Sequence, residues 1–111
     1  MAVTVEASGT QTATVTTEHT LETNTGDKVF VLIVDKANMV NGDVLELRCK
    51  TKCLSGGTTR TAYMATYQNA QSADDMIAIS IPIPSDEEFV ATLKQTAGAA
   101  GRNFPWKVVS L

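Results

Sequence analysis

Aromatic residues, cysteine and clustered positive charge are all scarce in this sequence of 111 residues. Phe, Trp and Tyr make up only 5% of the chain, so a carbohydrate-binding module would be poorly equipped. Nine Lys and Arg against 12 Asp and Glu give a formal net charge of −3. A nucleic-acid binder must neutralise phosphates with clustered cations, and a membrane-spanning helix needs about 18 consecutive apolar residues. The sequence has neither, so we expect no nucleic acid and no membrane among its partners.

The sequence also lacks the short motifs that identify common enzymes. It contains no Gly-x-Ser-x-Gly elbow, Walker loop, His-Glu-x-x-His pair or EF-hand loop. The one histidine, His19, lies in a Thr-rich stretch and is predicted to be a half-exposed strand residue. An enzyme would have to be built from His19 and scattered carboxylates such as Asp74, Asp75, Glu87 and Glu88. We therefore predict a protein that is not an enzyme, without catalytic residues, cofactor or metal.

Two cysteines, Cys49 and Cys53, lie four residues apart in a segment that alternates apolar and polar residues. On an extended strand they would face the same side about 13 Å apart, too far for a disulfide, which needs Cα atoms within about 7 Å. A zinc site needs four ligands, and only His19 could join them. We expect two free thiols that pack as small hydrophobic residues, which indicates folding in a reducing cytoplasm. An intermolecular disulfide stays open. The first residues also lack the basic region of a Sec-type export signal.

Alternation of period two dominates the chain and is typical of β-strands. The clearest element is a hairpin whose two strands are joined by the Gly-containing linker Ser55–Thr58. Spacing of about ten residues between strands favours a single-domain, all-β protein: an antiparallel β-sandwich or barrel of seven to eight strands. Residues 1–9 are a candidate N-terminal arm. The predicted strands cover residues 3–6, 10–21, 28–35, 44–54, 59–68, 76–84, 89–95 and 104–111.

Two of these strands have unusual apolar patterns. Residues 28–35 are apolar on both faces, which suits a central strand covered by a second sheet, a neighbouring element or another subunit. In residues 76–84, Ile occupies positions 77, 79, 81 and 83, and the simplest interpretation is the inner face of a sheet. An inter-subunit seam is the alternative. Pro82 cannot donate a hydrogen bond, so this strand is expected at a sheet edge or to end near that residue.

Aromatic residues in the hairpin and near the C-terminus allow two interpretations. Tyr63, Tyr67 and Trp106 could form a platform for sugar rings if they were exposed together. However, Phe104 and Trp106 alternate with Pro105 and Lys107, as core residues on a strand do. The core interpretation is favoured.

The C-terminal quarter resembles a known group of small proteins. The segment Phe89–Gly98, which contains Thr92-Leu93-Lys94-Gln95, is followed by Gly101-Arg102 and a short aromatic strand around Phe104 and Trp106. This ending is similar to that of small proteins encoded beside capsid genes in tailed bacteriophages. The hairpin Val44–Gln68 resembles them more loosely. The resemblance implies a virion structural protein of the head decoration or cement type, which is commonly a trimer.

We therefore predict a capsid decoration protein that stabilises the phage head by bridging subunits of the major capsid protein. It would assemble in the host cytoplasm, form a homotrimer and reside on the capsid surface. The alternatives are a tail, head-tail-junction or fibre-associated β protein, or a carbohydrate- or ligand-binding β-sandwich. Two sets of residues are expected at the capsid or subunit interface. The first is the N-terminal segment Ala2, Val3, Thr4, Val5 and Glu6, and the second is the cationic set Arg48, Lys50, Lys52 and Arg102.

Overall fold

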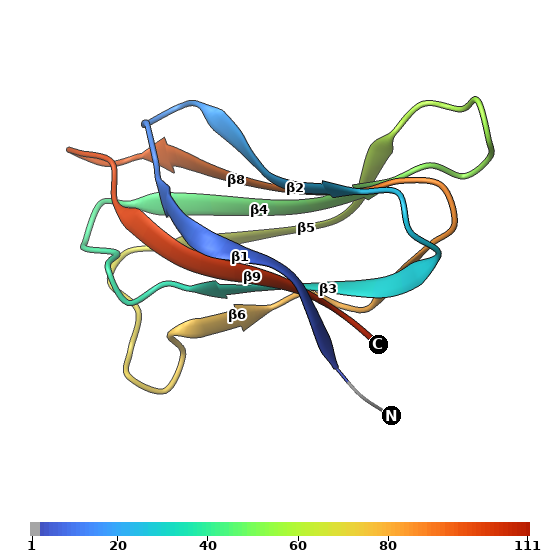
Figure 1. Cartoon of the computed structure of the whole chain (residues 1–111). Coiled ribbons are helices and arrows are strands. Elements are labelled where there is room, and N and C mark those ends of the chain that lie inside the picture. Colours follow the sequence, from blue (N-terminus) through green and yellow to red (C-terminus); the bar gives the residue numbers. More distant parts are fainter. Residues whose placement is uncertain (1–2) are drawn as a thin grey trace.

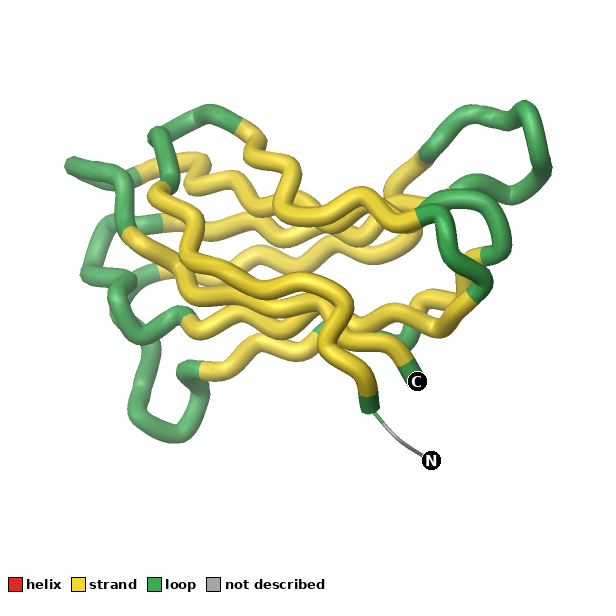
Figure 2. Tube along the Cα trace, viewed as in Figure 1, coloured by secondary structure: helices red, strands yellow, loops and turns green. Residues whose placement is uncertain are grey.

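The computed structural model describes residues 3–111, which form strands and connecting loops and no helix that could cross a membrane (Figures 1 and 2). Their order is β1 (Thr4–Thr12), β2 (Glu18–Asn24), β3 (Lys28–Asp35), β4 (Val44–Thr51), β5 (Arg60–Gln68), β6 (Ile77–Ile79), β7 (Ile83–Ser85), β8 (Phe89–Ala97) and β9 (Asn103–Ser110).

The strands form two antiparallel sheets that lie over one another (Figure 1). The first, sheet A, has the order β1-β9-β3-β6, and β7 pairs with the other end of β3. The second, sheet B, has the order β2-β8-β4-β5. The all-β prediction is confirmed, and the described strands do not close into a barrel. They number nine rather than seven or eight, in part because the predicted strand 76–84 is divided into β6 and β7.

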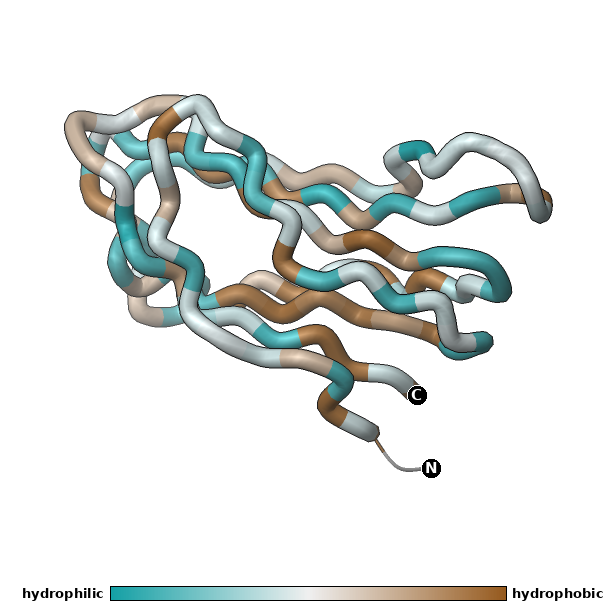
Figure 3. The backbone as a smooth tube through the Cα atoms, turned by 45° about the horizontal axis from the view of Figure 1, so that its top comes forward, coloured by the Kyte–Doolittle hydropathy of each residue, from teal (hydrophilic) through white to brown (hydrophobic). Residues whose placement is uncertain are grey.

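The core lies between the two sheets and follows the alternation of the strands. On β3, Phe30, Leu32 and Val34 point inward, and Phe30 stacks on Phe89 of β8 with ring centroids 4.7 Å apart. Leu45, Leu47 and Cys49 of β4 are buried in the same cluster, as the sequence pattern predicts. Hydrophobic stretches accordingly run along the strands of both sheets (Figure 3).

The prediction of one strand over residues 10–21 is wrong, because the chain turns between β1 and β2. Thr16 has a positive φ of 72°, and the Thr17 N–H donates to the Thr14 carbonyl. The Nε2 atom of His19 accepts a hydrogen bond of 3.0 Å from the Thr14 N–H. His19 is a half-exposed residue of β2, as expected, and its visible role is to close this turn.

Candidate interaction surfaces

The isoleucine row of the β6 segment lies on the outer face of sheet A, so its prediction as an inner face is wrong. Ile77, Ile79 and Ile81 are 54%, 59% and 53% exposed, whereas the alternate residues Ala78 and Ser80 are buried. Alternation separates two sets of residues but does not say which set faces the core. Here small residues take the inward positions, and the Ser80 hydroxyl accepts the Leu32 N–H at 2.9 Å. Only Ile83, on β7, joins the core.

The row belongs to a wider apolar surface on the outer face of sheet A, which we call the outer apolar face. Ile33 of β3 pairs with Ile79, and Val31 pairs with Val109 of β9. Val31 and Val109 lie outside the core cluster between the sheets, but they are only 8% and 4% exposed and add little open surface. Val5 of β1 pairs with Val109 and is more than half exposed. β3 is thus apolar on both faces, as its sequence indicates, but sheet B covers only the inner one.

The expected position of Pro82 is confirmed, because β6 is an edge strand and ends at Ile79. A hollow of about 550 Å³ runs along this edge and is lined by Ile77, Ile79 and, from β5, Tyr67. Lys36 lies buried in its wall, with Nζ 3.6 Å from the centre of the Tyr67 ring and 3.0 Å from Gln71 Oε1. Burial lowers the pKa of Lys36, an effect that the charge of Asp75 opposes.

The predicted N-terminal arm is part of sheet A in the described residues. Thr4, Val5 and Glu6 belong to β1, which pairs with β9, and Val3 directly precedes it; Ala2 lies outside the described residues. The Glu6 carboxylate accepts hydrogen bonds of 2.6 Å from Lys28 Nζ and from the Ser110 hydroxyl, and these two bonds lower its pKa. The segment is therefore tied to its own chain.

The cationic candidates do not form one free surface. Arg48 and Lys50 lie on the outer side of β4 and pair with Glu46 at 2.7 Å and with Glu18 at 3.1 Å. A hydrogen bond from Thr92 and the neighbouring Lys50 lower the pKa of Glu18. Lys52 lies beyond the end of β4. Arg102 is distant in sequence from Arg48 and Lys50 on β4, and it forms an ion pair of 2.9 Å with the buried Asp43.

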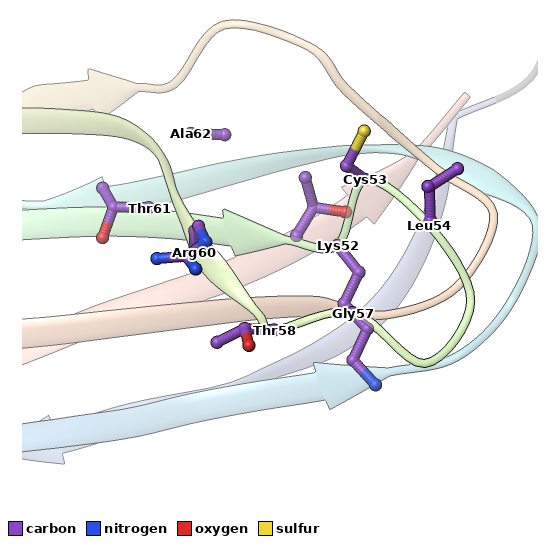
Figure 4. A pocket seen from close by; sticks show the side chains of 9 residues that line it. Lys52, Cys53, Leu54, Gly57, Thr58, Arg60, Thr61 and Ala62 are labelled. Atoms are coloured by element: carbon purple, nitrogen blue, oxygen red, sulfur yellow. The ribbon is translucent and has the colours of Figure 1, made fainter.

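The two cysteines are both free and have different environments. Cys49 is fully buried, as predicted. Cys53 is exposed, because β4 ends before it and the chain enters the β4–β5 loop; its predicted inward orientation is wrong. Figure 4 shows the Cys53 thiol with Lys52 and Arg60 around a hollow at the base of this loop. Among residues 3–111 no three His, Cys, Asp or Glu side chains are grouped to hold a metal ion.

We expect Cys49 to make stability fall at alkaline pH. Burial raises the pKa of its thiol from 9.0 to about 11. The folded state therefore keeps the proton more tightly than the unfolded state, and this contribution is full below pH 9 and is lost as the pH rises towards 11. Its size is about 2 to 3 kcal/mol. Urea unfolding of the wild type and Cys49→Ala tests this: the difference in stability between them should shrink over that range. A constant difference would contradict the prediction.

The aromatic residues pack against the core rather than forming a joint platform. Tyr63 and Tyr67 are half-buried on the inner side of β5, and Trp106 is half-buried on β9 of the opposite sheet. Phe104 is fully buried. The core interpretation is confirmed, and the arrangement does not favour stacking of sugar rings.

A polar cluster that the sequence pattern did not indicate joins the loops at one end of the molecule. Asp43 Oδ2 accepts hydrogen bonds from Arg102 Nε at 2.9 Å and from the Val40 N–H at 3.0 Å. The buried Gln95 accepts from the Arg102 N–H at 2.9 Å and donates to the Ala100 carbonyl at 2.8 Å. These residues hold the β3–β4 and β8–β9 loops together, and the cluster therefore has a structural role.

Comparison with known proteins shows similarity at the level of the fold. No family model matches the chain, and no curated protein matches it. A crystal structure of PirA superposes with a TM-score of 0.59 at 12% sequence identity, covering 94% of this chain and 93% of that one. A protein from the disulfide-linked pili formed by Bacillus endospore appendages has a TM-score of 0.55 at 15% identity, covering 99% and 90%. At these identities the likeness concerns the fold alone.

Proposed function

We propose that this protein is a structural subunit of a phage virion, a head decoration protein that binds the assembled capsid shell. Its body would be a β-sandwich of jelly-roll type, in which β6 and β7 are one interrupted strand of a double four-stranded arrangement. The sequence resemblance of residues 89–108 to small phage proteins supports the location. The outer apolar face supports the mode of action.

The observation that matters most is the exposure of three large isoleucines in one row. Exposed apolar surface of this kind is typical of a protein-protein contact. Ile77 and Ile79 lie on β6, and Ile79 pairs with the half-buried Ile33 of β3, so most of the row belongs to the sheet, whereas Ile81 lies between β6 and β7. A rigid apolar face suits binding to a repeated, preformed surface such as a shell.

The mechanism would be bridging. A copy that buries its outer apolar face across two capsid subunits adds contacts that must break before the subunits separate. A typical stable interface buries about 1,600 Å² in total. Repetition over many sites on one shell makes modest affinity per copy sufficient.

Co-sedimentation with empty phage heads that lack the protein tests this proposal. The wild type should bind with saturation, at a fixed ratio to the major capsid protein, and raise the heat resistance of the heads. Ile79→Lys places a charge on the outer apolar face and should weaken binding by about 10- to 100-fold, which corresponds to about 1.4 to 2.8 kcal/mol.

Met64→Lys is the matched control, because Met64 is 54% exposed on β5 of the other sheet. It should bind heads like the wild type. Equal binding by both variants would remove the outer apolar face as the contact. Failure of the wild type to bind heads would remove the decoration role itself.

A further inference from the structure

The backbone of β6 has hydrogen-bonding groups that face away from the sheet. The Lys36 N–H donates to the Met76 carbonyl at 2.7 Å, and the Ser80 N–H donates to the Leu32 carbonyl at 2.9 Å. Residues of an antiparallel edge strand alternate between bonding their neighbour and facing outward. Met76, Ala78 and Ser80 thus bond β3, and Ile77 and Ile79 direct their N–H and C=O groups to the open edge, beside the hollow described above.

The opposite edge of sheet A is formed by β1 and has the same arrangement. The Ala13 N–H donates to the Arg102 carbonyl at 2.9 Å. In the β1–β9 register, Gln11 and Gly9 continue this bonded series, because they pair with Phe104 and Trp106. Ser8, Thr10 and Thr12 therefore direct their backbone groups away from β9. Their side chains are exposed.

The two edges run in opposite directions, and neither carries a charged side chain. Each neighbouring pair in the order β1-β9-β3-β6 is antiparallel, so β1 and β6 run in opposite directions. A second copy placed beside the first in the same orientation would therefore continue the antiparallel alternation. Residues 7–12 and 76–85 contain no Asp, Glu, Lys or Arg, so neither edge has the charges that commonly prevent edge pairing.

We propose that β6 of one copy pairs with β1 of a second copy, so that sheet A continues from copy to copy. In this contact the outward residues Ile77 and Ile79 of β6 would lie beside Ser8, Thr10 and Thr12 of β1, so the outer apolar face would end at the junction against polar side chains. The contact is head-to-tail, because each copy offers one β6 edge and one β1 edge; such contacts produce rings or open rows. It goes beyond binding of a shell, since it can form without one.

Cross-linking between copies tests the proposal in the full chain. All variants carry Cys53→Ser, which removes the exposed native thiol. Cys49 is buried and is left in place. Thr10→Cys and Ile79→Cys proteins are prepared separately and treated with a short bismaleimide, alone and as a mixture. The mixture should give covalent dimers well above either protein alone, and the double variant should give a ladder of larger species. In the control mixture Met64→Cys replaces Ile79→Cys. This mixture should not give covalent dimers above the level of either protein alone.

Any other pattern of cross-linked products would overturn the proposal. Equal cross-linking of Ile79→Cys alone would indicate two β6 strands paired about a two-fold axis. Equal cross-linking with Met64→Cys would indicate random collision. No dimer in the mixture at any soluble concentration would show that the edges do not meet. Because heads are absent, these outcomes are separate from the failure of shell binding.

A second pair of variants tests the backbone contact itself. Ile77→Pro removes an N–H that faces the open edge but leaves the bonds to β3, whereas Ile77→Thr keeps that N–H. Ile77→Pro should reduce cross-linking by about two- to tenfold, the effect of one lost hydrogen bond, relative to Ile77→Thr. Circular dichroism confirms that both are folded. Equal cross-linking would show that the β6 backbone is not in the contact.

Discussion

Replacing Gly101 by alanine is expected to lower the free energy of unfolding by about 3 to 5 kcal/mol, a large effect for one methyl group. A Cβ at this position would overlap the carbonyl oxygen of Ala13 and lie 2.8 Å from its carbonyl carbon. Backbone cannot rotate away as a side chain can. The Gly101 segment would have to move, which would break the hydrogen bond from the Ala13 N–H to the Arg102 carbonyl and displace the buried Ala13. Urea unfolding at neutral pH measures the loss.

Gly56→Ala is the control that separates a steric overlap from backbone strain. Gly56 has a φ of 79°, but a Cβ there would meet nothing within 4 Å. Its replacement should cost only about 1 kcal/mol, the ordinary penalty of a left-handed conformation. If Gly101→Ala cost no more than Gly56→Ala, the close approach of the two backbones at Ala13 would not determine stability.

Local pattern was sufficient to predict most strands. Residues 28–35 form β3 with the predicted bounds, and the hairpin of β4 and β5 lies where alternation and the Ser55–Thr58 linker place it. Such segments alternate clearly and end in residues that favour turns. The turn between β1 and β2 was missed because Ala13–Thr17 contains no Gly, Pro, Asn or Asp. Its geometry depends on His19, which bonds it from the following strand.

The orientation of the isoleucine row could not be predicted, because it depends on the partner layer rather than on the strand. Ile77 and Ile79 have large hydrophobic side chains, yet the side of this edge that faces the core is occupied by Ala78 and Ser80. Sequence alternation is equally consistent with either side facing the core. The alternative of an inter-subunit seam fits the exposed row, and the proposed function depends on that exposure.

Arg102 illustrates a second limit of prediction from sequence, which is that ion pairs between distant residues leave no local pattern. Its charge made it a candidate for binding an acidic shell, but the charge is used within the chain. Asp43 and Arg102 are 59 residues apart, and nothing local to either indicates the other. The Gly101-Arg102 pair that suggested a resemblance to phage proteins has a physical explanation in this structure. The glycine permits a close approach to Ala13, and the arginine side chain reaches Asp43.

Arg102→Ala is expected to destabilise the protein by about 3 to 5 kcal/mol, more than Asp43→Ala, which should cost about 2 kcal/mol. The asymmetry follows from exposure. The Asp43 side chain is 1% exposed and the Arg102 side chain 25%. Without Arg102 the carboxylate stays buried without a cation, whereas without Asp43 the guanidinium can turn to solvent. Chemical denaturation of both variants measures the two losses.

The double variant Asp43→Ala/Arg102→Ala makes the argument decisive, because it removes the buried charge together with its partner. Its stability should be close to that of Asp43→Ala and clearly above that of Arg102→Ala, so Asp43→Ala rescues the loss caused by Arg102→Ala. Simple addition of the two losses would instead show that each residue acts through other contacts.

Folded Asp43→Ala/Arg102→Ala protein should still bind phage heads if the outer apolar face is the contact, since both residues lie in the loops at one end of the molecule. Loss of binding would support the prediction that Arg102 is an interface residue.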